Sequence, residues 1–107
     1  MMRGEIWTMR DDLYASKARP VVIVQSDEIS CFDSVVLCLM TTFESSDMPT
    51  RVRVEPSAEN GLERTSFVMA DKVASVSRGM LGKRVGVLES DRMDEVAEKL
   101  ALVLGLL

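Results

Sequence analysis

The chain has 107 residues, of which 47% are hydrophobic and 28% are charged, a composition typical of one soluble globular domain spanning 1–107. Its formal net charge of −4 argues against a general nucleic-acid-binding protein, which usually has a basic surface. The sequence contains no histidine, which excludes Ser-His-Asp and Cys-His catalytic arrangements.

Short apolar runs rich in β-branched residues predict an antiparallel sheet of five or six strands. In chain order the expected strands are Gly4–Met9, Pro20–Gln25, Ser34–Thr42, Pro49–Glu55, Ser66–Val76 with a break near Asp71, and Lys83–Leu88. The segment Arg10–Ala18 is expected to be a loop, and the Asn60-Gly61 pair is the strongest short turn signal.

The C-terminal segment has the pattern of an amphipathic helix that begins at an N-cap Ser90 and ends near Gly105. Its apolar residues recur three and four positions apart; they are Met93, Val96, Ala97, Leu100, Val103, Leu104 and Leu107. A small antiparallel sheet needs a cover for one face, so this helix is expected to pack on it, giving a mainly β (α+β) domain.

The acidity of the chain is concentrated in this helix. Residues 89–99 contain five acidic and two basic residues, whereas the rest of the chain is nearly balanced in charge. Local basic pairs therefore remain elsewhere, namely Lys17/Arg19, Arg51/Arg53 and Lys83/Arg84.

Cys31 and Cys38 are the only cysteines, and without histidine they cannot form a zinc site of the usual kind. We expect both to be reduced packing residues, and we expect no metal or cofactor. No apolar run approaches the roughly 20 residues that span a bilayer. The N-terminus is charged almost at once and lacks the apolar core of a signal peptide, so a cytoplasmic protein without membrane contact is expected.

Arg19 is the most conspicuous polar residue. Pro20 restricts the residue before it to an extended conformation, which places Arg19 at the start of a rigid apolar strand. If that strand pairs with Ser34–Thr42, Arg19 lies beside Thr41 at one edge of the sheet. From these residues alone, a solvated arginine and an ordinary strand threonine are the better explanation of the pattern. Tyr14 either stacks on a base or anchors the loop before Arg19.

The order of several segments nevertheless resembles the MazF/PemK/Kid family of toxin endoribonucleases. The resemblance is carried by 2–7, by 19–24, by 35–42 with its Thr doublet, by 61–73, by 81–88 and by the helix that ends at 104–106. It implies a compact SH3-like antiparallel β-barrel with short helices, acting as a homodimer. Members cleave single-stranded RNA, often mRNA, without a metal, and a cognate MazE-like antitoxin blocks them. DNA would be reached only through that antitoxin.

The same resemblance implies site residues. Arg19 and Thr41 match the catalytic pair, with the 2′-OH attacking the adjacent phosphate to leave a 2′,3′-cyclic phosphate and a 5′-OH. Further contacts to RNA are expected from Tyr14, Lys17, Thr42, Asp71 and Lys72. Many members have a longer first loop with an acidic stretch; the short loop here leaves the general base unassigned. Two alternatives stay open: a CcdB-like gyrase inhibitor, or an inactive relative that only binds its antitoxin.

Overall fold

The computed structural model describes residues 1–10 and 18–106. Its elements are β1 (Glu5–Met9), β2 (Arg19–Ile23), β3 (Ser34–Thr41), β4 (Arg51–Val54), β5 (Ser66–Ser77), the 3-10 turn η2 (Arg78–Met80), β6 (Leu81–Val87) and α1 (Ser90–Leu104). All six strands and the helix lie within a few residues of the positions that the sequence pattern predicts.

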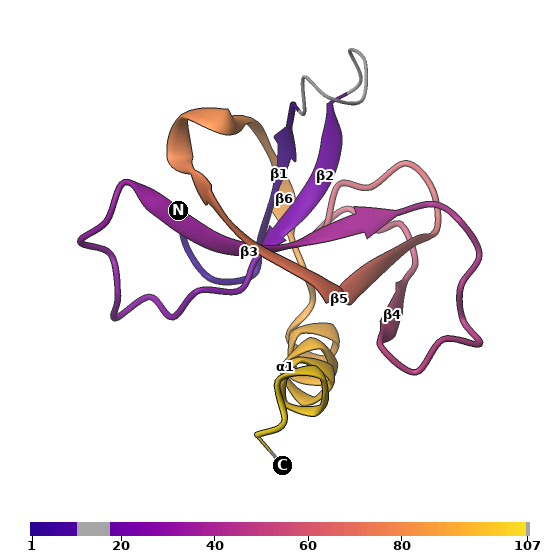
Figure 1. Cartoon of the computed structure of the whole chain (residues 1–107). Helices are drawn as coiled ribbons and strands as arrows, with labels where there is room; N and C mark the ends of the chain where they lie inside the picture. Colours follow the sequence, from indigo (N-terminus) through magenta and orange to yellow (C-terminus); the bar gives the residue numbers. More distant parts are fainter. Residues whose placement is uncertain (11–17, 107) are drawn as a thin grey trace.

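The strands form one antiparallel sheet in the order β4-β5-β3-β2-β1-β6, with α1 packed below it (Figure 1). The mainly β architecture is therefore confirmed. Among the described residues β4 and β6 do not pair, so the sheet stays open where a complete barrel would close. The β4–β5 connection spans this opening, because Val87 N–H donates to Glu59 O at 2.9 Å.

The strongly curved sheet has two apolar clusters. One lies between the sheet and α1; it contains Ile6, Val22, Val24, Cys38, Met40, Val52, Val54, Val68, Leu88, Met93 and Val96. The other lies on the opposite face and contains Met9, Val21, Ile23, Val35 and Leu37. The strand ends that carry the candidate site extend from this second cluster.

The start of α1 differs from the prediction. Glu89, not Ser90, is the N-cap, and its side chain makes no capping bond. Its carboxylate is occupied instead, because Asn60 Nδ2 donates to Glu89 Oε1 at 2.9 Å and Ser57 Oγ donates to Oε2 at 3.3 Å. The end of the helix is as predicted, with Gly105 in the left-handed conformation at φ 70°.

Asn60 and Gly61 form the predicted turn, within the longer connection between β4 and β5. Gly61 has φ +69°, and a Cβ there would lie 2.2 Å from the carbonyl oxygen of Val85. The Asn60 side chain is fully buried and accepts from the backbone N–H groups of Ser57 and Leu62, both at 3.0 Å. The Asn60 side chain therefore stabilises the β4–β5 connection through bonds within it and joins it to Glu89 at the start of α1.

Candidate active site

The site begins with the register of β2. Arg19 pairs with Met9 of β1, and Val21 pairs with Leu39 of β3. Continuing the β2–β3 register by two residues places Arg19 opposite Thr41. Directly opposite residues of an antiparallel pair project from the same face, so both side chains belong to one edge of the sheet. This is the neighbourhood that the sequence predicts for the two residues.

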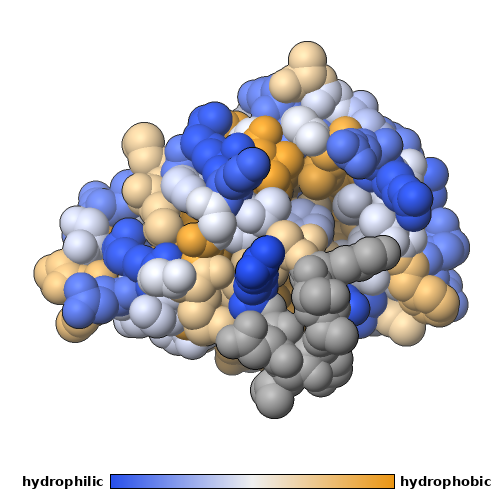
Figure 2. Space-filling model, turned by 90° about the horizontal axis from the view of Figure 1, so that it is seen from above, coloured by the Kyte–Doolittle hydropathy of each residue, from blue (hydrophilic) through white to orange (hydrophobic). Residues whose placement is uncertain are grey.

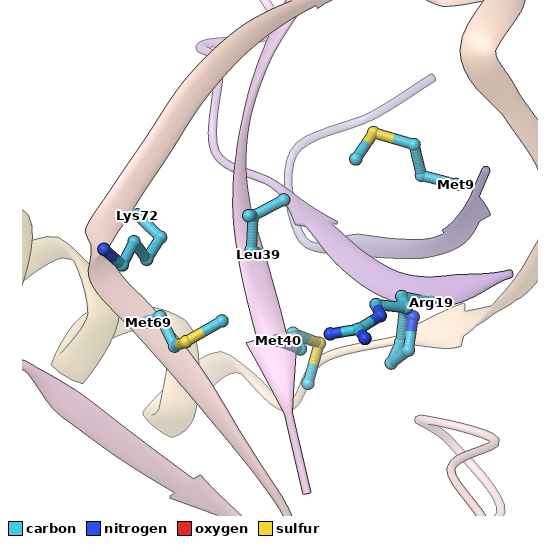
Figure 3. A pocket seen from close by; sticks show the side chains of 7 residues that line it. Met9, Arg19, Leu39, Met40, Met69 and Lys72 are labelled. Atoms are coloured by element: carbon cyan, nitrogen blue, oxygen red, sulfur yellow. The ribbon is translucent and has the colours of Figure 1, made fainter. Parts of the chain in front are cut away.

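A cavity of about 340 Å³ opens beside this edge. Its lining is mostly apolar, with two cationic side chains: it consists of Met9, Arg19, Pro20, Leu39, Met40, Met69 and Lys72 (Figure 3). From above, the molecule shows the same mixture at larger scale, with apolar surface lying between strongly hydrophilic side chains (Figure 2). An apolar floor with cations at its edge suits a nucleobase flanked by phosphates.

The two cations lie on opposite sides of β3. In Figure 3 the Arg19 guanidinium extends from β2 towards Met40, whereas Lys72 lies on β5 with its ammonium nitrogen pointing away from Arg19. Within residues 1–10 and 18–106, neither cation has an ion-pair partner. By contrast, carboxylates pair with Arg51, Arg53, Arg84 and Arg92. As far as the described part of the chain goes, no carboxylate competes with an anionic ligand for Arg19 or Lys72.

The two residues of the Thr doublet face different surroundings. Thr41 Oγ1 accepts a hydrogen bond from the backbone N–H of Phe43 at 3.1 Å, which orients the hydroxyl at the end of β3. Thr42 lines a separate hollow of about 390 Å³ together with Thr8 and Pro20. The structure therefore brings Thr41 to the strand edge of Arg19 and places Thr42 in the neighbouring hollow.

Asp71 does not line the cavity, because its carboxylate is held by β4. Arg51 donates from Nε to Oδ1 at 2.9 Å and from Nη2 to Oδ2 at 3.2 Å, and Thr50 Oγ1 donates to Oδ1 at 2.8 Å. The hydrogen bonds from Arg51, followed by that from Thr50, lower the pKa of Asp71 from 3.8 to about 2. At neutral pH this carboxylate is ionised and already paired.

The residues around Asp71 interrupt the β3–β5 ladder. Cys38 pairs with Val73, and two residues later Met40 pairs with Val68, so β5 contains extra residues at this point. The sequence predicts a break near Asp71, and the structure has a bulge there within one continuous strand. This bulge determines which β5 side chains reach the cavity.

Two of the expected RNA contacts, Tyr14 and Lys17, lie outside the described residues. The methionines of the cavity were missed in the sequence because a methionine in a strand normally signals only packing. The sequence shows Arg51 as part of a local basic pair, but its ion-pair partner Asp71, twenty residues away, has no local signal. Among the described residues no cluster of Asp, Glu, His or Cys is suited to hold a metal ion. No described helix is long and apolar enough to span a membrane.

Two relatives with similar sequences match most or nearly all of the chain. A probable endoribonuclease MazF of Mycolicibacterium smegmatis is 36% identical over 107 residues, covering 99% of this chain and 98% of that protein. The endoribonuclease EndoA of Bacillus subtilis is 25% identical over 91 residues, covering 83% of this chain and 78% of the relative.

Solved structures lead to the same group of proteins. A mycobacterial endoribonuclease in complex with its cognate antitoxin superposes with a TM-score of 0.84 at 26% identity, covering 100% of this chain and 97% of that one. A MazE–MazF complex of Deinococcus radiodurans, at 19% identity and a TM-score of 0.78, shares the fold; it covers 98% of this chain and 95% of its own. The family described as PemK-like, MazF-like toxin of type II toxin-antitoxin system matches residues 2–104. The chain therefore belongs to the PemK-like, MazF-like toxins of type II toxin–antitoxin systems.

Proposed function

We propose that this toxin is an endoribonuclease that cleaves single-stranded RNA, with mRNA as its cellular substrate, at the edge formed by Arg19 and Thr41. The observation that carries the proposal is the position of Arg19: it lines a cavity with an apolar floor, opposite Thr41 in the continued strand register. The names of two relatives, both endoribonucleases, support an RNA substrate.

The proposed reaction is an in-line transesterification. The 2′-oxygen forms a bond to the adjacent phosphorus while the bond from phosphorus to the 5′-oxygen breaks. The products are a 2′,3′-cyclic phosphate and a 5′-OH end, with one proton leaving the 2′-OH and one reaching the 5′-oxygen. Negative charge grows on the phosphoryl oxygens in the transition state. Arg19 stabilises it, because a guanidinium is always charged and presents several donors in one plane.

Thr41 and Lys72 complete the proposed site. The bond from Phe43 N–H uses a lone pair of Thr41 Oγ1, which leaves the hydroxyl hydrogen to donate to a phosphate oxygen. Lys72 binds a further phosphate from the β5 side of the cavity. No carboxylate is among the described residues that line this cavity, so its contribution is charge stabilisation by the two cations. The proposed reaction proceeds without a metal. Contacts of Tyr14, Lys17, Thr42 and Asp71 with RNA stay predictions.

The proposed setting is that of a toxin–antitoxin pair. The toxin acts in the cytoplasm as a homodimer, and a cognate MazE-like antitoxin inhibits it; DNA is contacted only through that antitoxin. The neighbour solved with its cognate antitoxin supports this partner. Exposed apolar residues at the end of α1 and just after it support a second subunit, since Leu102, Leu104 and Leu106 are more than half exposed at 53%, 55% and 73%.

The test is incubation of the purified protein with a long single-stranded RNA in excess EDTA, followed by mapping of the new ends. Cleavage at a short recurring sequence with cyclic phosphate ends supports the proposal. Intact RNA together with double-strand DNA breaks in expressing cells would instead indicate the gyrase inhibitor. Intact RNA without growth arrest on expression would indicate the inactive relative.

A further inference from the structure

We infer that Asp71 is a positioning residue: its ion pair with Arg51 fixes the bulge of β5 that brings Met69 and Lys72 together at the wall of the RNA-cleaving cavity. This inference rests on the proposed function, since it assigns a role within the same site. It differs from a direct contact of Asp71 with RNA.

The bulge is visible in the strand register. On one side of it Cys38 pairs with Val73, and on the other side Met40 pairs with Val68. Continued inward by one residue, the first register places Lys72 opposite Leu39, and the second places Met69 opposite Leu39. One residue of β3 therefore faces two residues of β5, and all three line the cavity. In a regular strand, Met69 and Lys72 would project from opposite faces of the sheet.

The two intervening residues are held by the beginning of β4. Ala70 is fully buried, and its backbone N–H donates to the carbonyl oxygen of Thr50 at 3.1 Å. Asp71 receives two bonds from Arg51 and one from the Thr50 hydroxyl. The side chain of Arg51 is only 11% exposed and that of Asp71 is 31% exposed, so water competes weakly for the pair. The bulge is thus held by backbone and side-chain hydrogen bonds to Thr50 and Arg51, on the side of β5 that faces β4.

The position of Lys72 depends on the bulge. It follows Asp71 directly, and its stem lines the cavity on the β5 side, across β3 from Arg19 (Figure 3). If the pair with Arg51 is lost, the bulge is free to relax towards a regular register, which would turn Lys72 away from the cavity. Asp71 then acts on RNA only through Lys72, and the low pKa of its paired carboxylate fits a role other than proton acceptor.

Charge alone predicts that removing the Asp71 carboxylate has the opposite effect on RNA binding. Removing a carboxylate near a polyanion lowers repulsion and releases the Arg51 cation, so RNA binding would tighten. The positioning role predicts weaker cleavage despite this gain. Arg51→Lys separates the two effects further, because lysine keeps the charge but cannot donate to both carboxylate oxygens in the planar fork of arginine.

The experiment is a double-mutant cycle on cleavage of one RNA by the full-length protein. It measures kcat, KM and the salt dependence of kcat/KM for Lys72→Ala, Asp71→Asn, Arg51→Lys and the double variants with Lys72→Ala. Lys72→Ala should lower kcat/KM about tenfold, the effect of one charge-assisted hydrogen bond. It should also reduce the slope against the logarithm of salt concentration by about 0.7, the loss of one phosphate contact on a single strand.

Asp71→Asn and Arg51→Lys should each lower kcat/KM about fivefold, with a reduced salt slope, and should have almost no further effect in the Lys72→Ala background. Glu5→Gln is the matched control, since it removes the Arg84–Glu5 ion pair between β1 and β6, at the opposite edge of the sheet, where the N–O distance is 2.8 Å. This variant should leave kcat/KM and the salt slope unchanged. All activities are measured well below the melting temperature of each variant.

Equal effects of Asp71→Asn with and without Lys72 would overturn the inference, and so would an increase of kcat/KM in Asp71→Asn. Either result leaves the proposed function standing, because wild type still cleaves RNA. Absence of cleavage by wild type would instead remove the proposed function and this inference with it.

Discussion

Arg51 and Asp71 form a bidentate ion pair that joins β4 to the bulge of β5, with Nε–Oδ1 at 2.9 Å and Nη2–Oδ2 at 3.2 Å. The pair connects residues twenty positions apart and lies beside the cavity of Arg19 and Lys72. Because the guanidinium stabilises the ionised form of Asp71, the stability of the fold depends on the charge of this carboxylate.

Asp71→Asn should therefore lower the free energy of unfolding at neutral pH by about 1 kcal/mol, the upper range for a partly exposed pair. The folded-state pKa of Asp71, about 2, lies below its ordinary value of 3.8. The contribution is thus fully present above pH 3.8 and is lost as the pH falls through about 2. Denaturant unfolding of wild type and variant at several pH values measures this.

The control for this titration is Asp47→Asn, which changes an exposed carboxylate that accepts no hydrogen bond from the described residues. It should leave the unfolding free energy unchanged throughout. If the difference in unfolding free energy between wild type and Asp71→Asn stayed constant down to pH 2, the ion pair would not be the cause of that difference.

Asn60→Ala should be among the more destabilising single substitutions, lowering the free energy of unfolding by about 2–3 kcal/mol. The side chain is fully buried, and its loss leaves the N–H groups of Ser57 and Leu62 without their acceptor. Thermal and denaturant unfolding measure the effect. The matched variant Asn60→Asp keeps the acceptor and removes the donor to the carbonyl oxygen of Glu55, at 2.8 Å. Wild-type stability in Asn60→Ala would show that this network contributes little.

The two cysteines should differ sharply in reactivity. Cys38 is fully buried, and burial, together with the Asp71 charge, raises its pKa to about 12. Cys31 is exposed, so the prediction that both cysteines are packing residues is wrong for Cys31. Because the thiolate is the reactive form, iodoacetamide at mildly alkaline pH should label one thiol per native chain, mapped to Cys31, and both after unfolding. Rapid labelling of Cys38 in the native protein would contradict the described packing.

Thr41→Val should lower kcat/KM for RNA by about tenfold, because valine keeps the shape of threonine and lacks the hydroxyl that we assign to a phosphate oxygen. Thr41→Ser should stay close to wild type, since it keeps the oxygen that accepts from Phe43 N–H. Thr65→Val, which removes a hydroxyl bound to Glu55, serves as the control. Equal activity of the valine and serine variants would exclude the hydroxyl from the site.

The strands, the helix and the neighbourhood of Arg19 and Thr41 could be predicted because they follow from local pattern. β-branched runs and the Pro20 restriction act over a few residues, and antiparallel pairing then brings strand ends together. The prediction of Ser90 as the N-cap was wrong, because the helix begins one residue earlier than that prediction requires and Glu89 is the N-cap. The Glu89 carboxylate binds Asn60, which is distant along the chain, instead of capping the helix.

The bulge and its ion pair could not be predicted in this way. A break near Asp71 is visible in the sequence, but its consequence depends on Arg51 and on the register of β3, both distant along the chain. The same holds for the cavity floor: Met69 carries no local signal of a ligand, and it becomes part of the wall only through the extra residues of β5.

The most direct test of the central claim compares Arg19→Ala with wild type in cleavage of a long single-stranded RNA in excess EDTA. Arg92→Ala, which removes an arginine from α1 instead, is the matched control. The account predicts cleavage by wild type and by Arg92→Ala, and a loss of at least about 100-fold in Arg19→Ala, on the scale of one lost donor to a developing oxyanion. Undiminished cleavage by folded Arg19→Ala would contradict it.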